Sequence, residues 1–180
     1  MDTLIKKFKL NSKNGSLILK IGKPVSENIF NTCLSKQLFY NYLEKLQTKF
    51  PSIKPKKFSH IIYSYNTYHT IIDVNTFNKK TYAITKEETI QTKDYKAKLS
   101  YQNLENPFNI QIPYKCSSII KKDWISFYIY GKTFINFLHC RELTEDGKET
   151  DKVYHRIQIS LLDNIDMPSV TDIMSIFIDL

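Results

Sequence analysis

The C-terminal part of the sequence alternates apolar and polar residues over three consecutive stretches. These are Ile125–Tyr130, Thr133–Cys140 and Val153–Leu162. A period of two puts successive side chains on opposite faces of a β-strand, so each stretch is predicted to be a strand. Gly131 follows the first stretch and Asp146-Gly147 precedes the third, and both are turn signals. We therefore predict an antiparallel three-stranded meander over Lys122–Leu162.

Two predicted strands have one polar face and one apolar face. The last strand of the meander alternates Arg156, Gln158 and Ser160 with His155, Ile157, Ile159 and Leu161. Near the N-terminus, Ser16–Ile21 follows the turn signal Asn14-Gly15 and carries Ser16, Ile18 and Lys20 on one face. Such strands are typical of antiparallel sheets that are buried on one side.

The other elements follow from the same periodicities. Apolar residues recur at helical spacing in Ser35–Phe50, with Ser35 as a suitable N-cap and Pro51 as a stop, and again in Ser169–Asp179. Five β-branched and aromatic runs predict further strands: Phe58–Tyr65, Tyr68–Val74, Thr81–Thr85, Thr89–Thr92 and Asp94–Tyr101. Asn103–Ser118 contains two prolines and is predicted to be a loop. The fold class is therefore α+β, a single domain over residues 1–180 in which two or three helices pack on an antiparallel β-barrel or strongly curved sheet.

Composition narrows the classes of function. Lys and Arg outnumber Asp and Glu by 26 to 18, a balance that attracts polyanions, although a lysine-rich composition alone also produces it. Cys33, Cys116 and Cys140 are too far apart for a Cys-x-x-Cys pair, so reduced thiols and a cytoplasmic or nuclear, non-secreted protein are expected. No signal peptide or membrane-spanning run is visible, so no membrane partner is expected. The sequence has no glycine-rich phosphate loop, nucleophile elbow or clustered metal ligands.

Several predicted strands carry cations on their polar faces. They are Lys20, Lys96, Lys98, Lys122 and Arg156. Since alternation of this kind is the ordinary antiparallel pattern, it favours cations on the solvated side of the sheet. If the polar faces instead converge inside a barrel, these cations would line a basic channel suited to phosphate oxygens.

The order of elements resembles the RNA triphosphatase branch of the triphosphate tunnel metalloenzymes, the cap-forming enzymes of fungi, protozoa and large DNA viruses. An early Glu-x-Glu-x-Arg-Phe-Gly strand of that family is similar to Ser16–Gly22, and an Asp-Tyr-x-x-Arg-Ile-Ser strand is similar to Asp94–Ser100. An Arg-x-Lys-x-Arg-x-Ser-Phe strand is similar to Ile120–Phe127, and the closing Glu-x-Glu-x-Glu strand is similar to Arg156–Ser160. The resemblance implies a tunnel-shaped barrel.

The resemblance fails at the metal ligands. The family's glutamates hold a divalent metal that polarises the γ-phosphate. At their places stand Ser16, Ile18, Arg156, Gln158 and Ser160, and none of these supplies the anionic oxygen that Mg²⁺ or Mn²⁺ requires. Loss of metal-dependent hydrolysis is therefore expected, with no cofactor. Phosphate or RNA binding through the cations would survive, and Ser16, Gln158 and Ser160 would form a polar lumen.

Three hypotheses remain at this stage. The first is a non-catalytic tunnel-type barrel with a protein partner in a capping or transcription complex, RNA as a further ligand, and a Mediator-head type subunit as a scaffold version. The second is an active phosphohydrolase whose Mg²⁺ or Mn²⁺ is held by Asp73, Glu87, Glu88 or Asp94. The third is a single-strand RNA-binding sheet that stacks bases on tyrosines interleaved with lysines. Those tyrosines are Tyr63, Tyr65, Tyr68, Tyr82, Tyr95 and Tyr101.

Overall fold

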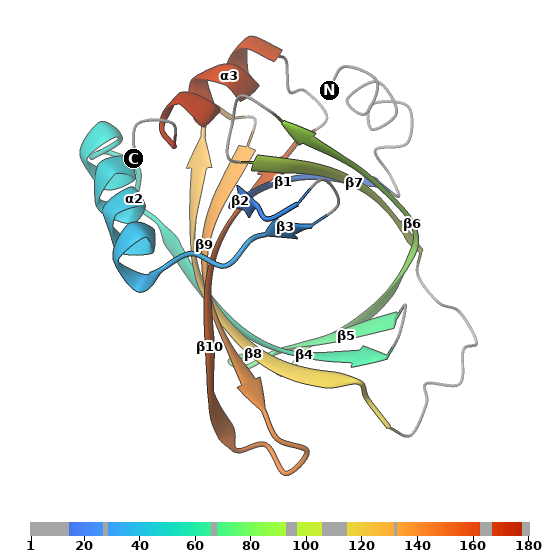
Figure 1. The fold of residues 1–180 in the computed structure, drawn as a ribbon. Helices are drawn as coiled ribbons and strands as arrows, with labels where there is room; N and C mark the ends of the chain where they lie inside the picture. Colours follow the sequence, from blue (N-terminus) through green and yellow to red (C-terminus); the bar gives the residue numbers. More distant parts are fainter. Residues whose placement is uncertain are drawn as a thin grey trace.

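Eight strands close into an antiparallel barrel in the computed structural model, which describes residues 15–26, 29–65, 68–92, 97–105, 115–131, 133–162 and 167–177 (Figure 1). The order around the barrel is β1-β10-β9-β8-β4-β5-β6-β7, and β7 pairs again with β1. The strands are β1 (Gly15–Ile21), β4 (Lys56–Tyr65), β5 (Tyr68–Asp73), β6 (Lys79–Thr92), β7 (Ala97–Glu105), β8 (Ser118–Ile129), β9 (Thr133–Leu143) and β10 (Glu149–Leu161). The predicted α+β barrel is confirmed.

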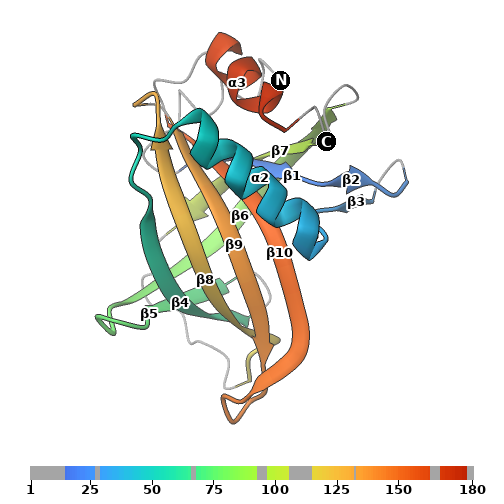
Figure 2. The same cartoon turned by 90° about the vertical axis from the view of Figure 1, so that its left-hand side faces the viewer.

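Two helices pack on the outside of this barrel. Figures 1 and 2 show α2 (Lys36–Lys49) lying across the outer wall and α3 (Met167–Ser175) beside one end of it. Ser35 caps α2, because its hydroxyl accepts the backbone N–H of Leu38 at 3.2 Å. None of the described helices has the length and apolar character needed to cross a membrane.

The main hydrophobic core lies between the helices and the outer face of the barrel wall. Leu17, Leu19 and Ile21 of β1 are fully buried there, while Lys20 is only half-buried on the opposite face. The same division holds in the neighbouring strands. Other core members are Phe39, Tyr42, Leu43, Leu46, Leu99, Phe127, Ile129, Ile135, Phe137, Ile157, Ile159, Leu161, Ile173, Met174 and Phe177. The outer face of these strands is therefore buried against the helices, and their other face lines the lumen.

Several predicted boundaries were wrong. The runs Thr81–Thr85 and Thr89–Thr92 are one strand, β6, with a register shift between Ile84 and Lys86. A bulge keeps a strand continuous while breaking its alternation, which explains the predicted interruption. β8 begins at Ser118, so the polar residues Lys121, Lys122 and Asp123 before Trp124 belong to this strand. β7 extends to Glu105 into the predicted loop, while residues 93–96 and 106–114 lie outside the described part of the chain.

A short hairpin of β2 (Lys23–Pro24) and β3 (Phe30–Asn31) follows β1 and was not predicted. It stands beside the barrel in Figure 2. Gly22 permits this turn because a β-carbon at that position would collide with the backbone carbonyl of Asn31. Leu34 then forms a bridge to His155 of β10, so this segment borders the wall where β1 ends.

Candidate functional site

Four of the five predicted cations line one cavity inside the barrel. These four residues, Lys20, Lys98, Lys122 and Arg156, are called the basic cluster below, and their cavity has a volume of about 200 Å³. Lys20 lies directly opposite Lys98 of β7 and Gln158 of β10 in the strand pairing. Lys96 lies outside the described residues. Strands far apart in the sequence thus bring their cations to one place.

The prediction that these cations face solvent on the outside of the sheet was wrong. They lie on the lumen side because the apolar faces of the same strands are covered by α2 and α3. Alternation shows which residues share a face, but the docking of the helices decides which face becomes the interior. The alternative of a basic channel is the arrangement in the structure.

The cations of the basic cluster influence one another electrostatically. Burial lowers the pKa of Lys20, a shift that Glu87 opposes and the charges of Lys98 and Arg156 reinforce. Burial also lowers the pKa of Lys122; the nearby Cys140 opposes this shift, and the charges of Arg156 and Lys20 add to it. Like charges at close range disfavour the charged form of each group. A bound anion would relieve that repulsion.

A single carboxylate contacts the basic cluster within the described part of the chain. Glu87 lies 3.7 Å from the Lys20 ammonium and also accepts a hydrogen bond from the Gln102 side chain at 3.3 Å. With four cations and one carboxylate, the cavity keeps an excess of positive charge. This balance favours a ligand with several negative charges.

Three buried polar atoms lack a hydrogen-bond partner among the described residues. Arg156 Nε and Ser100 Oγ lie with the basic cluster, and the third, His60 Nδ1, belongs to a residue opposite Lys122 in the strand pairing. Arg156 is oriented by the Tyr154 ring, 5.4 Å from its guanidinium carbon, and by a long contact of 3.9 Å to Cys33 Sγ. Ser100 shares the lumen face of β7 with Lys98. Because unpaired buried donors cost free energy, Arg156 Nε and Ser100 Oγ mark a place where a ligand oxygen would be stabilised.

The predicted polar lumen residues face the same interior. Gln158 lines the cavity, and Ser160 accepts a hydrogen bond from the Asn136 side chain at 3.3 Å. Ser16 is half-buried and lies opposite Gln102 in the strand pairing. Ile18 lies opposite Ser160, so β1 and β10 meet without carboxylates at the positions where the resemblance implies metal ligands. The described residues contain no group of three or more His, Cys, Asp or Glu side chains able to hold a metal ion. The donor set therefore does not fit a divalent metal.

The fold of this chain, a closed barrel with helices outside it, is similar to the folds of solved RNA triphosphatases. Pct1 RNA triphosphatase of S. pombe is similar over 99% of this chain and 91% of that chain, with a TM-score of 0.75 and 8% identity. The Mimivirus capping enzyme triphosphatase is similar over 99% of this chain and 95% of that chain, with a TM-score of 0.66 and 8% identity. The chain has the triphosphate tunnel fold. A structure of Pct1 in complex with the Spt5 CTD is also similar, with a TM-score of 0.65, 8% identity, and 98% and 88% of the two chains covered.

Comparisons of the sequence with known proteins do not add to this structural likeness. The sequence matches no protein-family profile and no curated protein sequence. At such low identity the likeness shows the fold and leaves the chemistry to be argued from the side chains in the tunnel.

The alternative metal ligands do not gather in the tunnel. Both oxygens of Asp73 have partners: Oδ1 accepts the backbone N–H groups of Asn75 and Thr76, and Oδ2 contacts His60 Nε2 at 3.1 Å. Glu87 faces the tunnel, whereas Glu88 pairs in register with Tyr101, whose side chain is buried in the outer core. Asp94 lies outside the described residues.

The tyrosines proposed for base stacking do not all share a surface, although Tyr63, Tyr65 and Tyr68 lie on one face of β4 and β5, where Tyr65 pairs with Tyr68. Tyr101 is buried in the outer core, and Tyr82 lies opposite His69, whose ring is 5.4 Å away. Tyr63 pairs with Ile119 on the outer side of the wall, and Tyr95 lies outside the described residues. The described members of this set therefore do not form one continuous stacking surface, because Tyr82 and Tyr101 lie apart from the three tyrosines of β4 and β5.

Some tunnel residues were not predicted as site residues. Phe30, from β3 of the short hairpin, and Thr32, directly after it, reach the cavity, and no sequence periodicity marks them. Ser100 could have been found, because it shares a strand face with the predicted cation Lys98. Cys140 lies opposite Lys122, a pairing that only the structure shows. Burial raises the pKa of the Cys140 thiol, and Lys122 and Arg156 oppose that shift.

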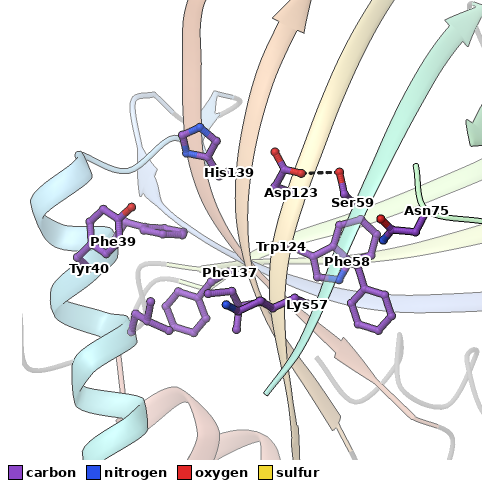
Figure 3. Close-up of a pocket in the computed structure, with 12 residues that line it drawn as sticks. Phe39, Tyr40, Lys57, Phe58, Ser59, Asn75, Asp123, Trp124, Phe137 and His139 are labelled. Carbon is purple, nitrogen blue, oxygen red and sulfur yellow. Dashed lines mark hydrogen bonds between the residues drawn. The ribbon is translucent and has the colours of Figure 1, made fainter. Parts of the chain in front are cut away.

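A second, larger cavity of about 400 Å³ lies outside the barrel, between α2 and the wall. Figure 3 shows Phe39 and Tyr40 projecting from the helix, with Ser59 and Asp123 joined by a hydrogen bond on the strand side. His139 lines this cavity and is 3.3 Å from His155, measured from Nδ1 to Nε2. His139 and Cys140 therefore point to opposite sides of β9, as predicted.

The histidine contact beneath α2 predicts a pH-dependent stability. Burial, then the neighbouring His139 and Lys36, lower the pKa of His155, and burial lowers the pKa of His69. The unfolded chain therefore binds more protons than the folded one just below the ordinary histidine value of about 6.5, so the free energy of unfolding falls as the pH drops through that window. In thermal melts we expect a lower melting temperature at about pH 5.5 than at about pH 7.5, and a smaller loss for His155→Gln. An equal loss in both proteins would show that His155 does not carry the effect.

Proposed function

We propose that this chain is a non-catalytic tunnel-fold domain that binds a phosphate chain, such as the triphosphate end of an RNA, in its basic tunnel. The observation that carries the proposal is the basic cluster, which converges on one cavity together with the unpartnered Arg156 Nε and Ser100 Oγ. Arginine and lysine donors are the usual ligands of phosphate oxygens, and charge-assisted hydrogen bonds are the strong ones.

The absence of carboxylates at the paired strand positions supports binding without hydrolysis. Ile18 and Ser160 face each other, and Lys20 faces Gln158, so cations and neutral groups occupy this part of the tunnel. Lys20 and Arg156 would repel a divalent metal there. The same cations would neutralise a phosphate chain directly.

The setting proposed for this binding domain is mRNA capping or transcription, with a protein partner. Support comes from the fold shared with capping triphosphatases and from a neighbour that was solved in complex with the Spt5 CTD. The formal net charge of +8 suits association with an acidic partner or with RNA.

Two measurements on the unaltered chain test the proposal. Calorimetric titration with inorganic tripolyphosphate in EDTA should show binding that weakens steeply with added salt, because the contacts are mainly ionic. Incubation with triphosphate-ended RNA or ATP and Mg²⁺ or Mn²⁺ should release no phosphate. Phosphate release that is lost in Glu87→Gln would overturn the non-catalytic reading. No binding of tripolyphosphate at low salt would overturn the phosphate site, and the hypothesis of a scaffold subunit would remain.

A further inference from the structure

Two aromatic side chains stack on each other at the rim of the tunnel. Tyr128, next to the end of β8, and Phe134, next to the start of β9, have ring centroids 4.8 Å apart and lie at 30°. Their exposed fractions are 48% and 37%, although both belong to the larger apolar residue types. Together they are called the aromatic platform. Two stacked and exposed rings offer an aromatic face on which a further planar group can stack.

The aromatic platform lies on the same face of the wall as the basic cluster. Phe134 pairs with Tyr128 on one side and with Ser160 on the other, and Ser160 pairs with Ile18 of β1. These partners share the tunnel face with Lys20 and Gln158, because residues directly opposite in a pair point to the same side. The platform is therefore continuous with the tunnel lining.

The spacing between the platform and the basic cluster suits a nucleotide. Arg156 lies opposite Leu138, four residues along β9 from Phe134, which corresponds to about 13 Å at the usual rise of a strand. This distance is of the order of the length of an extended nucleoside triphosphate, from its base to its terminal phosphate. Between the two lie Ser126, Asn136 and Gln158, whose amides and hydroxyl can hydrogen-bond a sugar.

From this arrangement we propose that the aromatic platform is a nucleobase subsite, so that the tunnel binds nucleoside 5′-triphosphates or RNA ends with the base at the β8–β9 rim and the phosphates in the basic cluster. Base stacking on aromatic rings tolerates any base, because every base has a π-face. The proposal rests on the proposed phosphate binding and adds the class of ligand and the end at which its base lies. Inorganic polyphosphate would use only the basic part of the site.

The test compares two ligands on the same protein. Titrations with ATP and with inorganic tripolyphosphate, both in EDTA, give the ratio of their affinities for the wild type, Tyr128→Ala, Phe134→Ala and the double variant. We expect the substitutions to weaken ATP binding by about 5- to 100-fold and to leave tripolyphosphate binding unchanged. Tyr40→Ala is the matched control, because Tyr40 has the same exposed fraction of 48% but lies on α2 outside the barrel.

The possible outcomes distinguish the nucleobase subsite from the proposed phosphate binding. Equal losses for both ligands in the platform variants, or an ATP affinity unchanged by them, would overturn the nucleobase subsite and leave phosphate binding intact. A wild type that binds neither ligand would overturn both proposals. Since both rings are half-exposed, the variants should fold, and a circular dichroism melt of each verifies this. Recovery of ATP affinity in Tyr128→Trp would add support, because an indole also stacks on a base.

Discussion

Replacing Arg156 with glutamine should lower the affinity for tripolyphosphate by about 10- to 100-fold, because hydrogen bonds to a charged group contribute about 1.5 to 3 kcal/mol each. Arg156 offers an unpartnered Nε to the cavity, and Lys20, Lys98 and Lys122 surround the same space. Arg156→Lys should recover only part of the loss, since a lysine keeps the charge but loses the planar fork of donors. Binding can be followed by calorimetry or by the fluorescence of Trp124, whose ring lies 4.8 Å from the Lys122 ammonium.

A control for this experiment removes one charge elsewhere. Lys148→Gln changes the net charge equally, at an exposed position in the β9–β10 turn where Lys148 pairs with Asp146. We expect it to leave tripolyphosphate affinity within about 2-fold of wild type, because exposed pairs contribute little. The Arg156→Gln protein should unfold at the same or a higher temperature than wild type, since repulsion on Lys20 and Lys122 is relieved. Equal losses of affinity in both variants would indicate a general charge effect instead of a site.

Replacing Phe137 with alanine should cost about 3 to 5 kcal/mol of the free energy of unfolding, the usual cost of removing a buried phenylalanine. Phe137 is 1% exposed and packs against Phe39 of α2 and Phe127 of β8, with ring centroids 5.4 and 6.0 Å away. A domain of ordinary stability has about 5 to 15 kcal/mol in total, so this variant is expected near the limit of folding. Denaturant unfolding monitored by circular dichroism measures the difference.

The matched control lies three residues away on the same strand. Phe134→Ala makes the same chemical change on the tunnel face, where the ring is half-exposed, and should cost less than about 1 kcal/mol. A cost for Phe134→Ala close to that for Phe137→Ala would show that packing inside the tunnel also holds the fold together. The two substitutions thus measure how unequally the two faces of β9 contribute to stability.

Much of the architecture follows from periodicity in the sequence. The alternation of β10 and β1 and the helix from Lys36 to Lys49 are where the pattern predicts them, because these elements bury one regular apolar face. The resemblance in the order of elements also gave the correct fold. What periodicity did not give is the side of the wall on which Lys20 and Arg156 lie, since that depends on contacts with α2 and α3 made far away in the chain.

Other features escaped for local reasons. The bulge near Ile84 interrupts the alternation of β6, and the two-residue strands β2 and β3 of the hairpin are too short to have a period. The aromatic platform was not predicted, because Tyr128 and Phe134 look like ordinary strand residues in the sequence and only the pairing of β8 with β9 brings their rings together. Lys96 remains a prediction, as it lies outside the described residues.

Because α2 and α3 pack against the outer face of the barrel wall, the stability of the fold and the chemistry of the lumen depend on different residues. Positions such as Ser16, Ile18, Gln158 and Ser160 do not belong to the outer core, so exchanging them is far less restricted than exchanging Leu17 or Ile159. A few substitutions on two neighbouring strands could therefore convert a tunnel that attracts cations into one that attracts anions, with the backbone unchanged. For protein engineering, this means that the ligand preference of the barrel can be changed by substituting lumen residues without disturbing the outer core.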